Sequence, residues 1–234
     1  MVVVAGVDGC PSGWLCVLKD LGTGTIVARI LARIDDVLML IPRPVVLMVD
    51  VPIGLTDAGP RECDLEARAK LGKPRSSSVF PAPVRPTLKA TSYLDACQLG
   101  VNADGRKLSQ QTWAILGKIR QVDTFLRSDP TLQELVREVH PEISFWAWNG
   151  NRAMSYRKKS MAGKVEREAL VMLRYGAAYT AAKSTLPRGQ YSNDDLLDAF
   201  AALWTAERVH AGKALTIPAR PPLDSCGLRM EILA

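Results

Sequence analysis

The stretch Val2-Val3-Val4-Ala5-Gly6-Val7-Asp8-Gly9 decides how the rest of the chain can be arranged. It is too short for an ordinary helix and has no alternation of polar residues. It therefore predicts a strand buried on both faces, in the middle of a sheet with helices above and below. A buried, unpaired carboxylate at the end of such a strand costs several kcal/mol, so we expect Asp8 to have a partner or a metal ion.

The same pattern, an apolar run that ends in aspartate, occurs again at Val45–Val51, where the aspartate is Asp50. Between the two runs, turn residues separate the expected strands Trp14–Leu18 and Ile26–Leu31, which with the first strand predict an antiparallel meander. A short helix is expected at Asp35–Ile41, before two prolines. The two apolar runs are then expected to be parallel neighbours joined by that helix, with their aspartates at the same edge of the sheet.

A helix over Asp194–Ala211, capped by Ser192 or Asn193, is the second informative stretch. Asp195 and Asp198 are three residues apart and fall on a face that otherwise carries alanines. Such a face suits close packing, with two carboxylates aimed inward at a shared metal site. The alternative for the acids at the start of the helix is ordinary capping and interaction with the helix dipole.

A last strand is expected at Val136–His140, followed by Glu142. Glu142 is a candidate for a further metal ligand and catalytic acid, or else an ordinary solvated residue after a proline. His140 is a candidate proton shuttle, although a single histidine is more often a hydrogen-bonded structural residue. With Asp8, Asp50, Asp195 and Asp198, Glu142 completes the predicted catalytic set.

Basic residues cluster in two parts of the chain outside the expected sheet. A mostly helical insertion is predicted at about 60–130, with helices at Glu62–Leu71, Tyr93–Leu99 and Ser109–Arg127. The segment Asn149–Lys164 is predicted to be an exposed basic loop, followed by a helix Lys164–Tyr175 that ends at Gly176. The basic side chains are expected to bind substrate phosphates, or else to form a solvated surface. The candidates for substrate binding are Arg61, Arg68, Arg75 and Lys164.

Composition limits the chemistry further. The 234 residues suit one domain, and the formal charge of +6 permits an anionic partner such as nucleic acid without requiring one. Five scattered cysteines and two histidines argue against a disulfide scaffold, a zinc site and a Ser-His-Asp triad. A metal site must then be built from carboxylates, which select Mg²⁺ or Mn²⁺. No membrane span or secretory signal is recognised, so a cytoplasmic protein is expected.

The motifs resemble those of a family of uncharacterised proteins described as predicted nucleases with a ribonuclease H-like fold of the RuvC type. The matching stretches lie at 6–14, 50–55, 61–64, 77–80, 140–142 and 194–199. The resemblance implies an α/β fold with a mixed five-stranded sheet flanked by helices. It also implies catalytic acids on the first strand, the fourth strand and the final helix, which match Asp8, Asp50 and the pair Asp195 and Asp198. The insertion departs from the minimal fold of that superfamily.

The favoured hypothesis is a divalent-metal-dependent nuclease that hydrolyses phosphodiester bonds of DNA or RNA by a two-metal mechanism. A non-catalytic binding or scaffold protein on the same fold is the alternative. An actin-like or sugar-kinase-like ATPase ranks last, because those proteins need two such domains around a nucleotide and no Walker-type loop is present. The sequence leaves the oligomeric state open.

Overall fold

The apolar run at the start of the chain forms the central strand of a mixed five-stranded sheet. The computed structural model describes every residue, Met1–Ala234. The strands are β1 (Val3–Cys10), β2 (Gly13–Asp20), β3 (Ile26–Leu31), β4 (Val46–Val49) and β5 (Val136–Glu138), in the order β3-β2-β1-β4-β5. The first three strands form an antiparallel meander, β4 runs parallel to β1, and β5 runs parallel to β4. This confirms the α/β class and the predicted neighbours.

Strand β1 is buried on both faces, as its continuous apolar sequence predicts. Val3, Ala5 and Val7 belong to one hydrophobic cluster, whereas Val4 belongs to another on the opposite face. Side chains alternate along a strand. Asp8 therefore lies on the same face as Val4.

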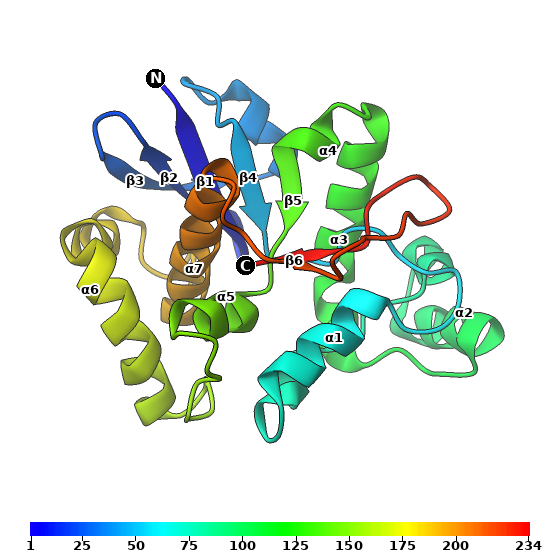
Figure 1. Cartoon of the computed structure of the whole chain (residues 1–234). Coiled ribbons are helices and arrows are strands. Elements are labelled where there is room, and N and C mark those ends of the chain that lie inside the picture. The colour runs from blue at the N-terminus through cyan, green and yellow to red at the C-terminus, as the bar shows by residue number, and fades with distance from the viewer.

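Helices cover both faces of the sheet (Figure 1). The Val4 face carries α5 (Pro141–Trp148), α6 (Met161–Thr185) and α7 (Asn193–His210), whose apolar residues join its cluster. The other face is packed by the 3₁₀ helix η1 (Ile34–Met39), α3 (Gln110–Ser128) and α4 (Leu132–Leu135). Because β1, β4 and β5 run parallel, their carboxyl ends lie at a common edge of this sheet.

Helix α7 packs closely on β1 because Gly6 has no side chain. A Cβ atom at Gly6 would lie 2.0 Å from the backbone nitrogen of Leu203 and 2.3 Å from the carbonyl oxygen of Ala199. The helix is buried without interruption from Leu196 to Ala206. This close packing brings the N-terminal half of α7 up against the end of β1 that carries Asp8.

The chain between β4 and β5 is mostly helical. It contains α1 (Glu62–Leu71), η2 (Arg75–Ser78), η3 (Arg85–Lys89), α2 (Tyr93–Asp104) and α3. Helix α3 contributes Ile119, Val122 and Leu126 to the core beneath the sheet. At least this helix is therefore a layer of the main core rather than a separate cap.

Three local predictions need correction. The connection before β4 is the 3₁₀ helix η1 rather than an α-helix over Asp35–Ile41. The last strand, β5, ends at Glu138 rather than at His140, because the side chain of His140 caps the helix α5, which has Pro141 at its first position. Helix α6 does not end at Gly176 but continues to Thr185 after a bend at Tyr175 (φ −124°, ψ 16°). One glycine costs a helix only about 1 kcal/mol relative to alanine, which burial of the following turns offsets.

The C-terminal segment returns to the sheet. Strands β6 (Thr216–Ile217) and β7 (Ile232–Leu233) form a small antiparallel pair, and Leu233 also bridges to Val139 just after β5. No helix has both the length and the apolar character needed to cross a membrane.

Candidate metal centre

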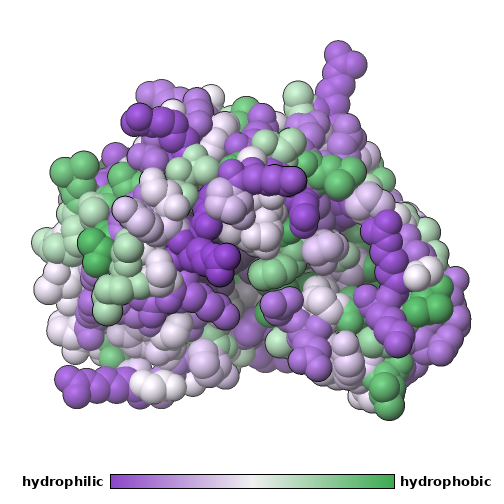
Figure 2. Space-filling model, turned by 90° about the horizontal axis from the view of Figure 1, so that it is seen from below, coloured by the Kyte–Doolittle hydropathy of each residue, from purple (hydrophilic) through white to green (hydrophobic).

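Three aspartates from distant parts of the chain meet at the carboxyl edge of the sheet. Asp8 lies near the end of β1, Asp50 directly follows β4, and Asp198 lies in the second turn of α7. One carboxylate oxygen from each lies within 4.8 Å of the other two. Figure 2 looks onto this end of the molecule and shows hydrophilic side chains around a hollow near the middle of the face.

Burial and neighbouring carboxylates raise the pKa of all three aspartates. Burial raises the pKa of Asp8 well above its usual value, and the neighbouring charges of Asp50 and Asp198 raise it further. The pKa of Asp50 is also raised, first by burial and then by Asp198. Burial raises the pKa of Asp198 to about 6, although Lys158 opposes the shift. Such a group is costly to ionise without a cation.

Hydrogen bonds within the protein satisfy this group only in part. The backbone N–H of Gly9 donates to Oδ1 of Asp8 at 2.7 Å. Oδ1 of Asp198 is buried without a partner, and the residue is only 3% exposed. A buried carboxylate oxygen needs a donor or a cation. The site therefore has the donor atoms and the unmet charge that a hard divalent cation requires, and the three aspartates could hold one.

Lys158 supplies a positive charge at the same place. Its ammonium group forms an ion pair with Oδ2 of Asp198. Burial alone would lower the pKa of Lys158, but Asp198, Asp8 and Asp50 together raise it well above its usual value. Lys158 belongs to the basic segment predicted as an exposed loop, and nothing in the sequence singles it out from Lys159 beside it.

A second lysine lies at the rim of the site. Lys118 of α3 donates from Nζ to the carbonyl oxygen of Gly13 at 2.5 Å, and Nζ lies 4.7 Å from the ring centre of Trp14. Its side chain crosses Gly9 so closely that a Cβ atom there would lie 2.5 Å from Cδ of Lys118. Burial lowers the pKa of this lysine. Because Gly9 has no side chain, the ammonium group of Lys118 can reach the edge of the sheet beside Asp8.

Asp195 and Glu142, both predicted to join the site, lie beside it with other partners. The carboxylate of Asp195 accepts hydrogen bonds from the backbone N–H and the hydroxyl of Ser192, at 2.8 and 2.7 Å, in a capping box. Glu142 is buried and forms a bidentate ion pair with Arg167, at 2.7 and 2.6 Å. The alternative of capping thus describes Asp195, while Glu142 is paired rather than solvated.

The ring of His140 takes part in a hydrogen bond that caps a helix. Its Nδ1 accepts a hydrogen bond from the backbone N–H of Glu142 at 3.2 Å, which caps α5. Burial lowers its pKa, so the ring stays neutral at physiological pH. The hydrogen-bonded structural role predicted for a single histidine fits this geometry.

A family model described as "Protein of unknown function (DUF429)" matches residues 6–223. The chain belongs to the DUF429 family. Searches of curated proteins and of solved structures found no match. The matched range includes all three aspartates of the site.

The basic residues predicted to bind substrate have different surroundings in this DUF429 chain. Arg61 is 2% exposed and is held by Glu138, at 2.7 and 2.8 Å, and by Asp64, so it is not available to a ligand. Arg68 donates to the carbonyl oxygen of Val79 at 2.7 Å. Arg75 is also buried, with Nε unpartnered. Lys164 is partly exposed and lies 3.7 Å from Asp194.

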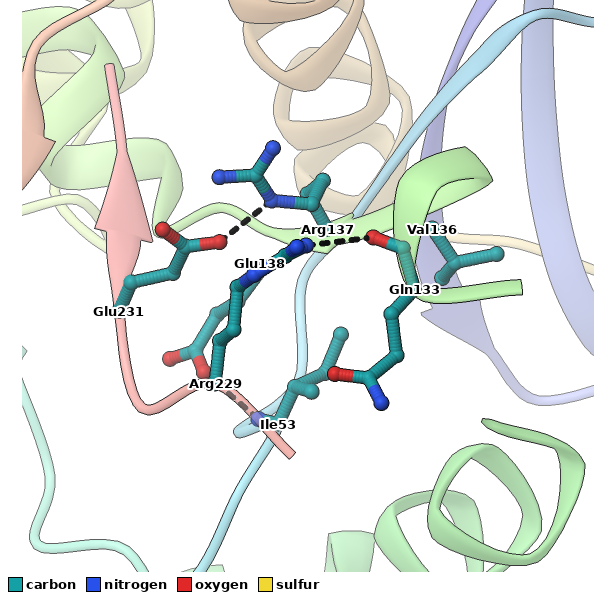
Figure 3. Close-up of a pocket in the computed structure, with 7 residues that line it drawn as sticks. All are labelled: Ile53, Gln133, Val136, Arg137, Glu138, Arg229 and Glu231. Carbon is teal, nitrogen blue, oxygen red and sulfur yellow. Dashed lines mark hydrogen bonds and ion pairs between the residues drawn. The ribbon is translucent and has the colours of Figure 1, made fainter. Parts of the chain in front are cut away.

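A small cavity lies beside Glu138, the partner of Arg61, and none of the three aspartates lines it (Figure 3). It is lined by Ile53, Gln133, Val136, Arg137, Glu138, Arg229 and Glu231. Glu138 accepts from the backbone N–H of Ile53 at 2.6 Å, and Arg137 pairs with Glu231 of the C-terminal segment. These groups bind one another and leave room for little more than water. The ion pairs around the cavity therefore attach the C-terminal segment to β5 and α4, and the cavity is too small to bind a substrate.

Proposed function

We propose that this DUF429 protein is a divalent-metal-dependent nuclease with a ribonuclease H-like fold. The observation that carries the proposal is the meeting of Asp8, Asp50 and Asp198 with one oxygen each within 4.8 Å, together with the unpartnered buried oxygen of Asp198. The strand order and the positions of the acids on β1, after β4 and on the last long helix agree with the resemblance noted in the sequence.

The residues of the site suggest how each would contribute. Asp8, Asp50 and Asp198 would hold Mg²⁺ or Mn²⁺, because carboxylate oxygens are the preferred ligands of these hard cations. The bound metal would supply an activated water and charge stabilisation for a phosphodiester. Lys158 and Lys118 place positive charge beside the acids, which favours a polyanionic substrate over a neutral one.

The arrangement of the site also limits which residues touch the substrate. Arg61 is internal and belongs to the fold, so phosphate contacts fall to the cations at the edge of the sheet. Glu142 and Arg167 neutralise each other behind the site and would support it from there. DNA or RNA would approach from the hollowed face in Figure 2.

The test uses purified full-length protein with Mn²⁺ or Mg²⁺ and a panel of substrates. The panel contains single- and double-stranded DNA, RNA, an RNA–DNA hybrid and a four-way junction. We expect cleavage of at least one substrate, which is lost in Asp8→Asn and on addition of a chelator. The matched control Asp57→Asn changes an exposed aspartate outside the group and is expected to keep activity.

Absence of cleavage on every substrate with both metals would reject the nuclease proposal. Nucleic-acid binding that persists under those conditions, and that does not depend on the three aspartates, would instead favour a non-catalytic binding or scaffold protein. Calorimetry with and without Mn²⁺ separates the two, because a ligand bound only by the native state raises its melting temperature.

A further inference from the structure

The segment that carries Lys158 is held in place by α6. Both oxygens of the Glu166 carboxylate accept hydrogen bonds from this segment, from the backbone N–H groups of Ser155 and Tyr156, at 2.7 and 3.2 Å. Met154 is only 2% exposed and packs in the core on the Val4 face of the sheet. The segment before α6 is largely exposed and has no helix or strand, as predicted, but Met154 and these hydrogen bonds attach it to the rest of the fold.

The turn around Lys158 has its own support. The carbonyl oxygen of Arg157 accepts hydrogen bonds from the backbone N–H and the hydroxyl of Ser160, at 2.9 and 2.7 Å. The same oxygen lies where a side chain at Gly163 would begin, since a Cβ atom there would be 1.9 Å away. A residue larger than glycine at 163 would push the turn off α6. Lys158 is thus presented by a fixed turn, and its contact with Asp198 does not depend on a mobile loop.

The available charges then limit the number of metal ions. Of the five acids predicted to form the site, Asp195 is used in the cap of α7 and Glu142 by Arg167. Three carboxylates remain, and the Lys158 ammonium already neutralises one charge. The three aspartates and Lys158 together carry a net formal charge of minus two, which equals that of one divalent cation in magnitude. A pair of divalent ions would instead bring the formal charge of the three aspartates and Lys158 to plus two.

We propose that Asp8, Asp50 and Asp198 bind a single divalent metal ion, and that the Lys158 ammonium takes the place of a second one. This rests on the proposed function and replaces the two-metal mechanism expected from the sequence with a metal-plus-lysine site. An ammonium can offset negative charge on a phosphate oxygen without carboxylate ligands of its own. Lys158 would therefore be a substrate-binding residue of the site.

The number of ions can be measured without any activity. Full-length protein is titrated with Mn²⁺ in a calorimeter, and the electron paramagnetic resonance spectrum of the bound ion is recorded. We expect one Mn²⁺ per chain, with the spectrum of an isolated ion. Lys158→Met is expected to bind Mn²⁺ about tenfold more tightly or better, because it removes a like charge from a partly buried site. Lys158→Arg keeps the charge and is expected to stay near the wild-type affinity.

Lys159→Met is the matched control, since Lys159 is exposed and forms no ion pair; its Mn²⁺ affinity should equal that of the wild type. Melting temperatures show that each variant is folded. Two Mn²⁺ ions per wild-type chain with a coupled spectrum would overturn the single-metal site and leave the nuclease proposal standing. Unchanged affinity in Lys158→Met would overturn the role of the lysine. Failure of the wild type to bind any Mn²⁺ would overturn both proposals.

Where cleavage is detected, activity gives a second readout. Lys158→Met should then lose activity at saturating Mn²⁺ although it binds the metal more tightly. If metal binding only displaced Lys158 from Asp198, the activity of Lys158→Met would be unchanged or higher than that of the wild type. That result would overturn the role of Lys158 in substrate binding.

Discussion

Replacing Arg167 by methionine tests the buried support behind the candidate site. Arg167 is 1% exposed and donates two hydrogen bonds to Glu142 and one to the carbonyl oxygen of Gly163 at 2.8 Å. Arg167→Met would leave the Glu142 carboxylate, itself 4% exposed, without its bidentate partner and near the charges of Asp50 and Asp198. Breaking a buried pair on one side costs about 3–5 kcal/mol. We expect a loss of that size in the free energy of unfolding.

Urea denaturation followed by circular dichroism measures this loss. The double variant Glu142→Leu with Arg167→Met replaces the pair by apolar side chains and should recover most of the stability, since such replacements are often neutral. Arg152→Met, at an exposed arginine that bonds only within its own loop, should change the free energy by less than about 0.5 kcal/mol. A loss below about 1 kcal/mol in Arg167→Met, or a double variant no more stable than the single one, would refute the reasoning.

Three further perturbations follow from the same geometry. Asp50→Asn removes a carboxylate that lies close to the charge of Asp198. Without metal, the melting temperature of this variant should exceed that of the wild type, and the increase in melting temperature on adding Mn²⁺ should disappear. A metal-free variant that melts below the wild type would contradict this. Asp198 has a folded-state pKa of about 6 against about 3.9 when unfolded, so its ionisation destabilises the fold. The free energy of unfolding of Asp198→Asn, relative to the wild type, should therefore increase by about 3 kcal/mol as the pH rises from about 4 to about 6, and then level off. Urea denaturation at several pH values measures it, and a difference that does not change with pH would rule out the raised pKa. Gly6→Ala should destabilise the protein strongly or prevent folding, because the added Cβ atom would clash with the backbone of α7. Gly117→Ala, at a position on α3 with no neighbour in reach, should gain up to about 1 kcal/mol in the free energy of unfolding. Equal effects of the two substitutions in thermal melts would disprove the close packing.

Much of the sheet and part of the site could be predicted from local patterns. The continuous apolar runs before Asp8 and Asp50 specify two doubly buried strands, and the turn residues between them specify a meander. Parallel strands then place both aspartates at one edge. Asp198 was predictable because it lies beyond the first turn of a helix whose remaining face consists of alanines, where neither capping nor solvation accounts for a carboxylate.

The remainder depended on partners far away in the sequence. Glu142 is paired with a residue 25 positions later, and no local pattern reveals that contact. Lys158 differs from Lys159 only in the direction fixed by the turn on Gly163. Asp195 is the exception: Ser192 three residues before it is the spacing of a capping box, so the sequence did contain the signal for its partner.

The distances along the chain between the three aspartates have a kinetic consequence. Positions 8, 50 and 198 come together only when β1, β4 and α7 have all docked, so no fragment of the fold offers a cation its full set of ligands. Closing such long loops precedes any gain from the ion. Added Mn²⁺ is therefore expected to slow unfolding in stopped-flow experiments while leaving the refolding rate almost unchanged, as for interactions that form after the transition state. A cation at this site would stabilise the folded structure once it has formed and would not nucleate folding.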